Sequence, residues 1–135
     1  DFTSDIPANT LIAFRNNIKD PNFTATVVII KNSLAKEVST LDYAKALKQK
    51  LSLELIDFKE LAAEQMAVKI GGIDNETLIT LVEGRDRAQG DLKRYYHRVG
   101  VKGSAAYIAV GSYLANEKTD VVETIDRMVK SFEVK

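Results

Sequence analysis

From residue 56 to residue 114 the sequence consists of strand-like segments joined by short turns, and no ten-residue helical pattern separates them. The segments are IDFKELAAEQMAVKIGGI, ETLITLVEGR, LKRYYHRV and AAYIAVGSYL. Consecutive strands joined by loops of a few residues pair in antiparallel order, whereas parallel pairing needs a long crossover connection. This stretch therefore predicts a sequential antiparallel meander of four or five strands.

Two strands and a helix precede the meander. The segments Leu11–Arg15 and Phe23–Lys31 are rich in β-branched and aromatic residues, and the turn-forming residues between them predict a hairpin with a long loop. Apolar residues then recur every three or four positions from Leu41 to Leu55, which is the pattern of a helix with one apolar face. Ser39 or Thr40 can cap this helix.

A second helix ends the chain. Asp120 and Glu123 have the spacing of a capping box, and an apolar stripe runs from Val121 to Phe132. The order is two strands, a helix, four or five strands and a helix, which predicts an α+β fold with a central, mostly antiparallel sheet of about six strands. We expect residues 1–9 to form a loop or tether and residues 10–135 to form a single domain.

The strands and helices supply apolar side chains at the spacing that buries them. We expect these side chains to meet in one common core. Its predicted members are Val28, Ile30, Leu47, Leu51, Ile108, Ile125 and Phe132.

The composition excludes several classes of site. The 135 residues include no cysteine, so the chain has no disulfide, thiolate nucleophile or iron–sulfur site. Its 19 basic and 19 acidic residues balance to zero, whereas a nucleic-acid-binding protein usually carries a basic excess, and we expect no nucleic-acid partner. The chain begins at Asp1 with no methionine or targeting segment, and we expect any membrane anchor to have preceded this residue.

The sequence contains no catalytic, metal-binding or cofactor-binding motif that we can identify. His97 is the one histidine, and no Gly-x-Ser-x-Gly motif accompanies it. No Asp-x-Asp-x-Asp-Gly loop is present to bind calcium, and the glycines Gly71 and Gly72 are not followed by the Lys-Ser/Thr of a phosphate-binding loop. We therefore expect no enzymatic activity, no cofactor and no metal, and we interpret His97 as an ordinary strand residue.

The segment LKRYYHRV is the best candidate for a binding surface. Because side chains alternate faces along a strand, Arg94, Tyr96 and Arg98 share one face, and the segment is too polar to be covered on both sides. Arg85 and Arg87 lie in the loop that leads to this strand. Tyr and Arg are the residue types that often anchor protein partners, so these five residues are our candidate binding residues, with a merely solvated strand as the alternative interpretation.

The order of elements and several short motifs resemble the PsbP-like superfamily. The matching features are the helix VSTLDYAKALKQKLS after a strand pair, the strand pair LKRYYHRVGVKGSAAYIAVGS and the final helix that closes on IDRMVKSFEV with Ser131 and Phe132. The segment PNFTATVVIIKNSL is similar to the second strand of related bacterial lipoproteins of the LpqN and DcrB type. The aromatic P-x-x-W-like segment that often begins these proteins is absent, because the chain has no tryptophan.

The resemblance implies an α-β-α sandwich, with helices packed on both faces of the sheet. It also implies a non-enzymatic accessory or binding role in a lipid-anchored or secreted protein outside the cytoplasm, in the periplasm, on the cell surface or in a lumen. The partner would be a protein or a cell-envelope component that binds an open sheet face, the membrane would be reached only through an N-terminal anchor, and the protein would be a monomer or a weak dimer.

Two other functions stay open on the sequence alone. The first is an intracellular adaptor that binds a GTPase-type partner, because nuclear-import factors that bind a Ran-type GTPase share the PsbP-like fold. The second is a small-molecule-binding protein or hydrolase with a pocket near Tyr95, Tyr96 and His97.

Overall fold

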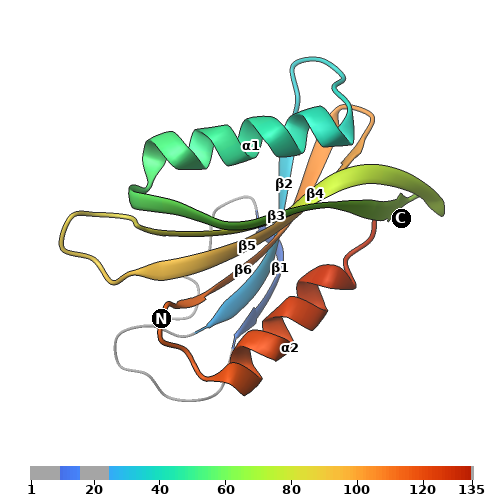
Figure 1. Cartoon of the computed structure of the whole chain (residues 1–135). Helices are drawn as coiled ribbons and strands as arrows, with labels where there is room; N and C mark the ends of the chain where they lie inside the picture. Colours follow the sequence, from blue (N-terminus) through green and yellow to red (C-terminus); the bar gives the residue numbers. More distant parts are fainter. Residues whose placement is uncertain (1–9, 16–24, 135) are drawn as a thin grey trace.

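The computed structural model describes the backbone of residues 10–15 and the whole of residues 25–134, and it shows one six-stranded sheet with two helices (Figure 1). The elements are β1 (Thr10–Arg15), β2 (Thr26–Ser33), α1 (Thr40–Glu54), β3 (Ile56–Ile70), β4 (Ile73–Arg85), β5 (Lys93–Lys102), β6 (Ala105–Leu114) and α2 (Thr119–Lys130). The predicted α+β class and the predicted order of elements are confirmed. The predicted N-terminal loop, residues 1–9, and the turn formers after β1 lie outside the described residues.

The sheet has the spatial order β1-β2-β6-β5-β4-β3, and every pair of neighbouring strands is antiparallel. The strands from β3 to β6 form the predicted meander, and β6 then pairs with β2. Gly71 and Gly72 make the two-residue turn between β3 and β4, with φ values of 58° and 79°. These positive φ values suit a tight hairpin turn and favour glycine at both positions.

The two helices lie on opposite faces of the sheet (Figure 1), which confirms the α-β-α sandwich. Ala44 of α1 packs on Val28 and Ile108, while Ile125 of α2 packs on Val27. The prediction of one common core was wrong, because neighbouring residues of a strand point to opposite faces and the sheet separates them into two layers.

The two helices begin differently. Ser39 caps α1, since its hydroxyl accepts a hydrogen bond from the Asp42 backbone N–H at 3.1 Å. The predicted capping box of α2 was wrong: the cap residue is Lys118, and its side chain makes no capping hydrogen bond. Asp120 instead lies inside the first turn, where its negative charge interacts favourably with the positive end of the helix dipole.

The residues after α2 fold back onto the far end of the sheet. Val134 pairs in parallel with Ile70 at the outer edge of β3, and it covers Gly100 of β5. With Val68, these apolar residues form a third, small cluster. Among the described helices, none has the length and apolar composition needed to cross a membrane.

Candidate functional site

Each helix covers only part of its side of the sheet. α2 packs on β2, β6 and β5, and its core reaches Ile79 of β4, so the face beyond Ile79 towards β3 and Leu81 has no helix over it. The strand register joins residues of β3, β4 and β5 into rows across this part of the face, because directly opposed residues share a face. We call this surface the bare face, and it consists of Ala62, Glu64, Leu81, Glu83, Arg94 and Tyr96.

The bare face combines apolar and charged groups. One row runs from Ala62 through Leu81 to Tyr96, and Leu81 and Tyr96 are half-buried against the core beneath α2. In the next row, Arg94 Nε lies 3.1 Å from Glu83 Oε1. An apolar strip beside a charge pair, rimmed by exposed side chains, is the kind of surface that a protein partner can cover.

Tyr96 stands at the border between α2 and the bare face. Burial is the largest cause that raises the pKa of its hydroxyl, and a hydrogen bond to Asp126 of α2 adds to the effect. The hydroxyl therefore stays protonated at neutral pH. Tyr96 thus presents a rigid ring with a polar end, which is typical of residues that anchor an interface.

Arg98 lies on the same sheet face as Arg94 and Tyr96, as predicted, but its side chain is buried and not exposed. Only 6% of the residue is exposed, and its guanidinium donates hydrogen bonds to the backbone carbonyls of Lys130, Phe132 and Ala67. Burial lowers the pKa of Arg98, although an arginine stays charged. The expectation that this residue lies on an open sheet face was wrong, because the segment after α2 folds over this end of β5.

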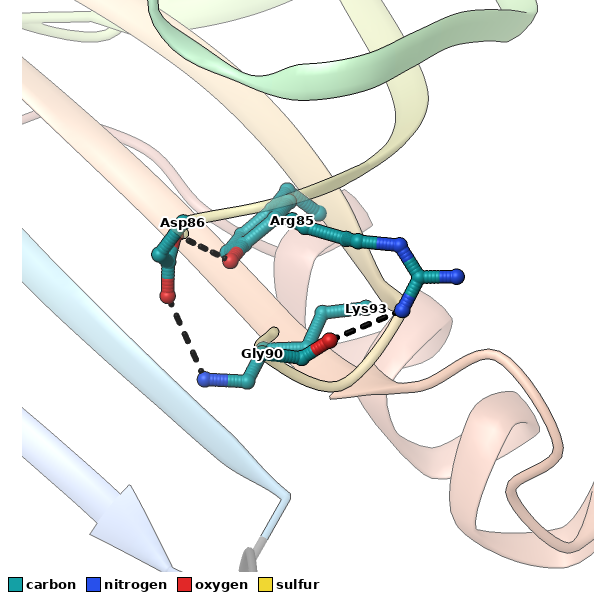
Figure 2. Close-up of polar contacts among 5 residues, drawn as sticks. Arg85, Asp86, Gly90 and Lys93 are labelled. Carbon is teal, nitrogen blue, oxygen red and sulfur yellow. Dashed lines mark hydrogen bonds and ion pairs between the residues drawn. The ribbon is translucent and has the colours of Figure 1, made fainter. Parts of the chain in front are cut away.

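The loop between β4 and β5 is held by a network of charged groups (Figure 2). Arg85 donates from its Nη1 to the Gly90 carbonyl at 2.8 Å, and Lys93 Nζ lies 3.3 Å from an Asp86 carboxylate oxygen. The Tyr95 hydroxyl donates to the other Asp86 oxygen at 2.8 Å. These contacts join residues of the loop to the end of β4 and to the start of β5.

A second contact of Arg85 ties this loop to the start of β3. Arg85 Nε lies 3.0 Å from Asp57 Oδ2, and Asp57 has a φ of 58°, the one positive value among the described non-glycine residues. The guanidinium of Arg85 therefore makes its contacts within the molecule, with Gly90 and Asp57. Arg87 is exposed and forms no ion pair with the described part of the chain, so it is the loop cation most available to a partner.

His97 is more buried than the sequence suggested. Only 6% of the residue is exposed, its Nδ1 has no hydrogen-bond partner in the described structure, and its ring stacks on Tyr95 at 6.3 Å between centroids. Burial lowers its pKa to about 4. At neutral pH His97 is an uncharged side chain shielded from solvent. The described residues contain no group of three or more His, Asp or Glu side chains arranged to hold a metal ion.

The structure thus divides the five candidate residues. It brings Arg94 and Tyr96 together on the bare face and buries Arg98. Arg85, which was predicted to lie in the loop, is the last residue of β4, and Arg87 lies in the loop that follows. The sequence did not point to the members of the bare face on β3 and β4. One signal was available: the run Ala62–Gln65 is small and polar within a strand, which suits a strand that is not covered on either face.

Comparisons with known proteins relate the chain only to a fold. No family model matches the sequence, and no curated protein matches it either. Among solved structures, the chain is similar to PA94 from Pseudomonas aeruginosa, a protein of unknown function that is described as a suggested regulator. The TM-score is 0.72 at 12% identity, with 92% of this chain and 82% of that chain covered. This similarity confirms that the arrangement of helices and strands occurs in an experimental structure.

Proposed function

We propose that this chain is a non-enzymatic binding domain of a lipid-anchored or secreted protein that acts outside the cytoplasm. Its partner is a protein or a cell-envelope component, and the binding surface is the bare face together with the exposed side of the β4–β5 loop. The location outside the cytoplasm rests on the resemblance to PsbP-like proteins and their lipoprotein relatives.

The observation that supports the binding role is the position of α2, which leaves the β3 side of its sheet face without a helix. Leu81 and Tyr96 are only half-buried there, and Ala62 is exposed. Apolar side chains that a helix leaves uncovered lower the free energy when a partner removes them from water. Arg87 stands at the end of the same strands and can extend the contact to an acidic group of the partner.

The surroundings of His97 favour binding over hydrolysis. A general base must come within hydrogen-bond reach of the substrate, directly or through one water. His97 is 6% exposed and is flanked in the sheet by Thr80 and Val110, so a substrate could not reach it without opening the core. The bare face, in contrast, is open to a partner in the folded state.

The binding role is tested by site-specific photo-crosslinking in the native host. The photoreactive amino acid p-benzoylphenylalanine is placed at Glu64 or Arg87, and at Glu123 on the exposed side of α2 as a matched control. We expect discrete adducts from Glu64 and Arg87 and none from Glu123. Adducts of equal yield at all three positions, or none at Glu64 and Arg87, would contradict the proposal.

The location is tested separately on the full natural protein. Cells are labelled with an alkyne fatty acid, fractionated, and treated with an external protease that cannot cross an intact inner membrane. A protein that is labelled, or that is digested in cells with a permeable outer layer, agrees with the proposed location. A protein that is recovered unlabelled and intact with the cytoplasmic fraction would overturn it.

A further inference from the structure

β3 forms one edge of the sheet, and most of its outer side has no strand beside it. Among the described residues, Val134 is the only one that pairs with this edge, at Ile70. An edge strand presents a row of N–H and C=O groups to which another strand can bind. The question is which of these groups are free.

The hydrogen bonds at the end of β3 show which residues point outward. The Val134 N–H donates to the Lys69 carbonyl at 2.8 Å, and the Gly71 N–H donates to the Val134 carbonyl at 2.7 Å. The backbone N–H and C=O groups of Lys69 therefore point away from β4, towards the open edge. Those of Ile70 point towards β4, where Ile70 pairs with Ile73 beside the two-residue turn.

In an antiparallel pair, the direction of the backbone groups alternates from one residue to the next. The register between β3 and β4 is regular from Ala62 to Ile70. The backbone groups of Ala63, Gln65 and Ala67 therefore point to the open edge, as those of Lys69 do. The Ala67 carbonyl already accepts a hydrogen bond from Arg98. The outward groups of Ala63 and Gln65 have no partner in the described structure.

The free part of the edge has clear limits. On one side, the register shifts between Glu60 and Ala62, and such a bulge interrupts regular pairing. On the other side, Arg98 and Val134 occupy the edge from Ala67 onward. Between these limits lies the segment Ala62–Met66, in which every residue except Met66 is exposed.

We propose that the outer edge of β3 from Ala62 to Met66 binds an extended segment of a partner protein, which adds to the sheet as a seventh strand. This inference rests on the proposed binding function and names the form of its partner. Val134 shows that an extended segment can pair with this edge, because it binds the end of β3 through two backbone hydrogen bonds. Strand addition of this kind is a common way to recognise an extended peptide.

The charge of the edge indicates what the partner strand carries. Glu64 is exposed on the bare face, it forms no ion pair with the described residues, and its neighbour on β4 is the apolar Ile79. A lysine or arginine directly opposite Glu64 on the added strand would form a favourable cross-strand pair. The partner is therefore an extended segment with a basic residue at this position.

A second copy of the chain fits the edge less well than such a segment. If two copies paired antiparallel over Ala62–Met66 about a twofold axis normal to the sheet, Glu64 would lie opposite Glu64. Like charges directly opposed across strands are destabilising. A contact of five residues is also well below the roughly 1,000 Å² that a specific interface usually buries.

The test uses proline at an outward position. Gln65→Pro removes an N–H that the fold does not use, and proline is tolerated on an edge strand when that N–H faces solvent. Gln65→Ala is the matched control, because it changes the same side chain and keeps the N–H. Both variants carry p-benzoylphenylalanine at Ala62, and adducts in the native host are quantified and their crosslinked peptides sequenced.

We expect Gln65→Ala to give wild-type adduct yield and Gln65→Pro to give about a tenfold lower yield, the size expected when one hydrogen bond is lost and its partner carbonyl stays unsatisfied. Glu64→Lys should also lower the yield. In the free protein, backbone amide exchange measured by NMR should be fast at Ala63 and Gln65 and slow at Glu64 and Met66. The same measurement on Gln65→Pro shows whether β3 stays folded.

Three outcomes overturn the inference. They are wild-type yield from a folded Gln65→Pro variant, an adduct between two copies of this chain, and a captured segment with no basic residue at the position opposite Glu64. In each case adducts from Arg87 would still support the proposed binding function. Loss of adducts at Arg87 as well would remove both proposals.

Discussion

At the scale of single residues, His97 couples the stability of the fold to pH. Its pKa is about 4 in the folded protein and about 6.5 in an unfolded chain. The unfolded state therefore binds the proton more readily, and the stability that neutral His97 contributes is complete above pH 6.5. This stability is lost as the pH falls from 6.5 to 4, and the loss amounts to about 3 kcal/mol.

This coupling can be measured by urea unfolding of the wild type and of His97→Gln between pH 7 and pH 4. We expect the free energy of unfolding of the wild type to fall more steeply over this range, and the difference between the two proteins to approach about 3 kcal/mol. Parallel curves would mean that His97 titrates alike in the folded and unfolded states.

Arg98 is the residue that holds the C-terminal segment to the sheet. Replacing it with methionine removes the donors of three backbone carbonyls and should lower the free energy of unfolding by about 2–4 kcal/mol. The control is Lys50→Met, which breaks an exposed ion pair with Glu54 and should cost about 1 kcal/mol or less. Chemical denaturation compares the two variants, and an equal cost for both would contradict the role of Arg98.

At the scale of elements, the close packing of α2 on β6 depends on Gly111, which has no side chain. A Cβ at Gly111 would clash with Ile125 Cγ2 and would lie 3.1 Å from Val129 Cγ2, both on the buried side of the helix. Gly111→Ala should therefore push α2 away from β6 and cost about 1–3 kcal/mol. Ser112→Ala, one residue on and facing the other side, is the control and should cost less in the same thermal unfolding series. A stable Gly111→Ala variant would show that α2 can move without loss.

The order of elements followed from the sequence because the two hydrophobic periods, near two and near 3.6, are local properties of the chain. The position of each helix on the sheet did not follow, since it depends on contacts between distant segments. Arg98 shows the same limit: its spacing gave the correct face, but its acceptors at Lys130 and Phe132 lie more than thirty residues away in the sequence. The bare face was therefore predicted only in part, through Arg94 and Tyr96.

At the scale of the whole molecule, the two helices lie on opposite faces of the sheet and are offset from each other. α1 lies over β4 and β5 with contacts to β3 and also packs on Val28 of β2 and Ile108 of β6, whereas α2 lies over β2, β6 and β5. β4 is thus supported on one side by α1 and is only partly covered on the other side, where Leu81 stays half-buried. The β4–β5 loop, which includes the exposed Arg87, follows directly on the last residue of β4.

The most direct test of this account is a hydrogen-exchange footprint of the full chain with and without the partner captured by crosslinking. We predict that binding slows the exchange of amides at Ala62–Met66 and in the β4–β5 loop, and leaves the exchange of α1 unchanged. Protection confined to α1, or to β2 at the opposite side of the sheet, would contradict the claim that the partner binds the bare face.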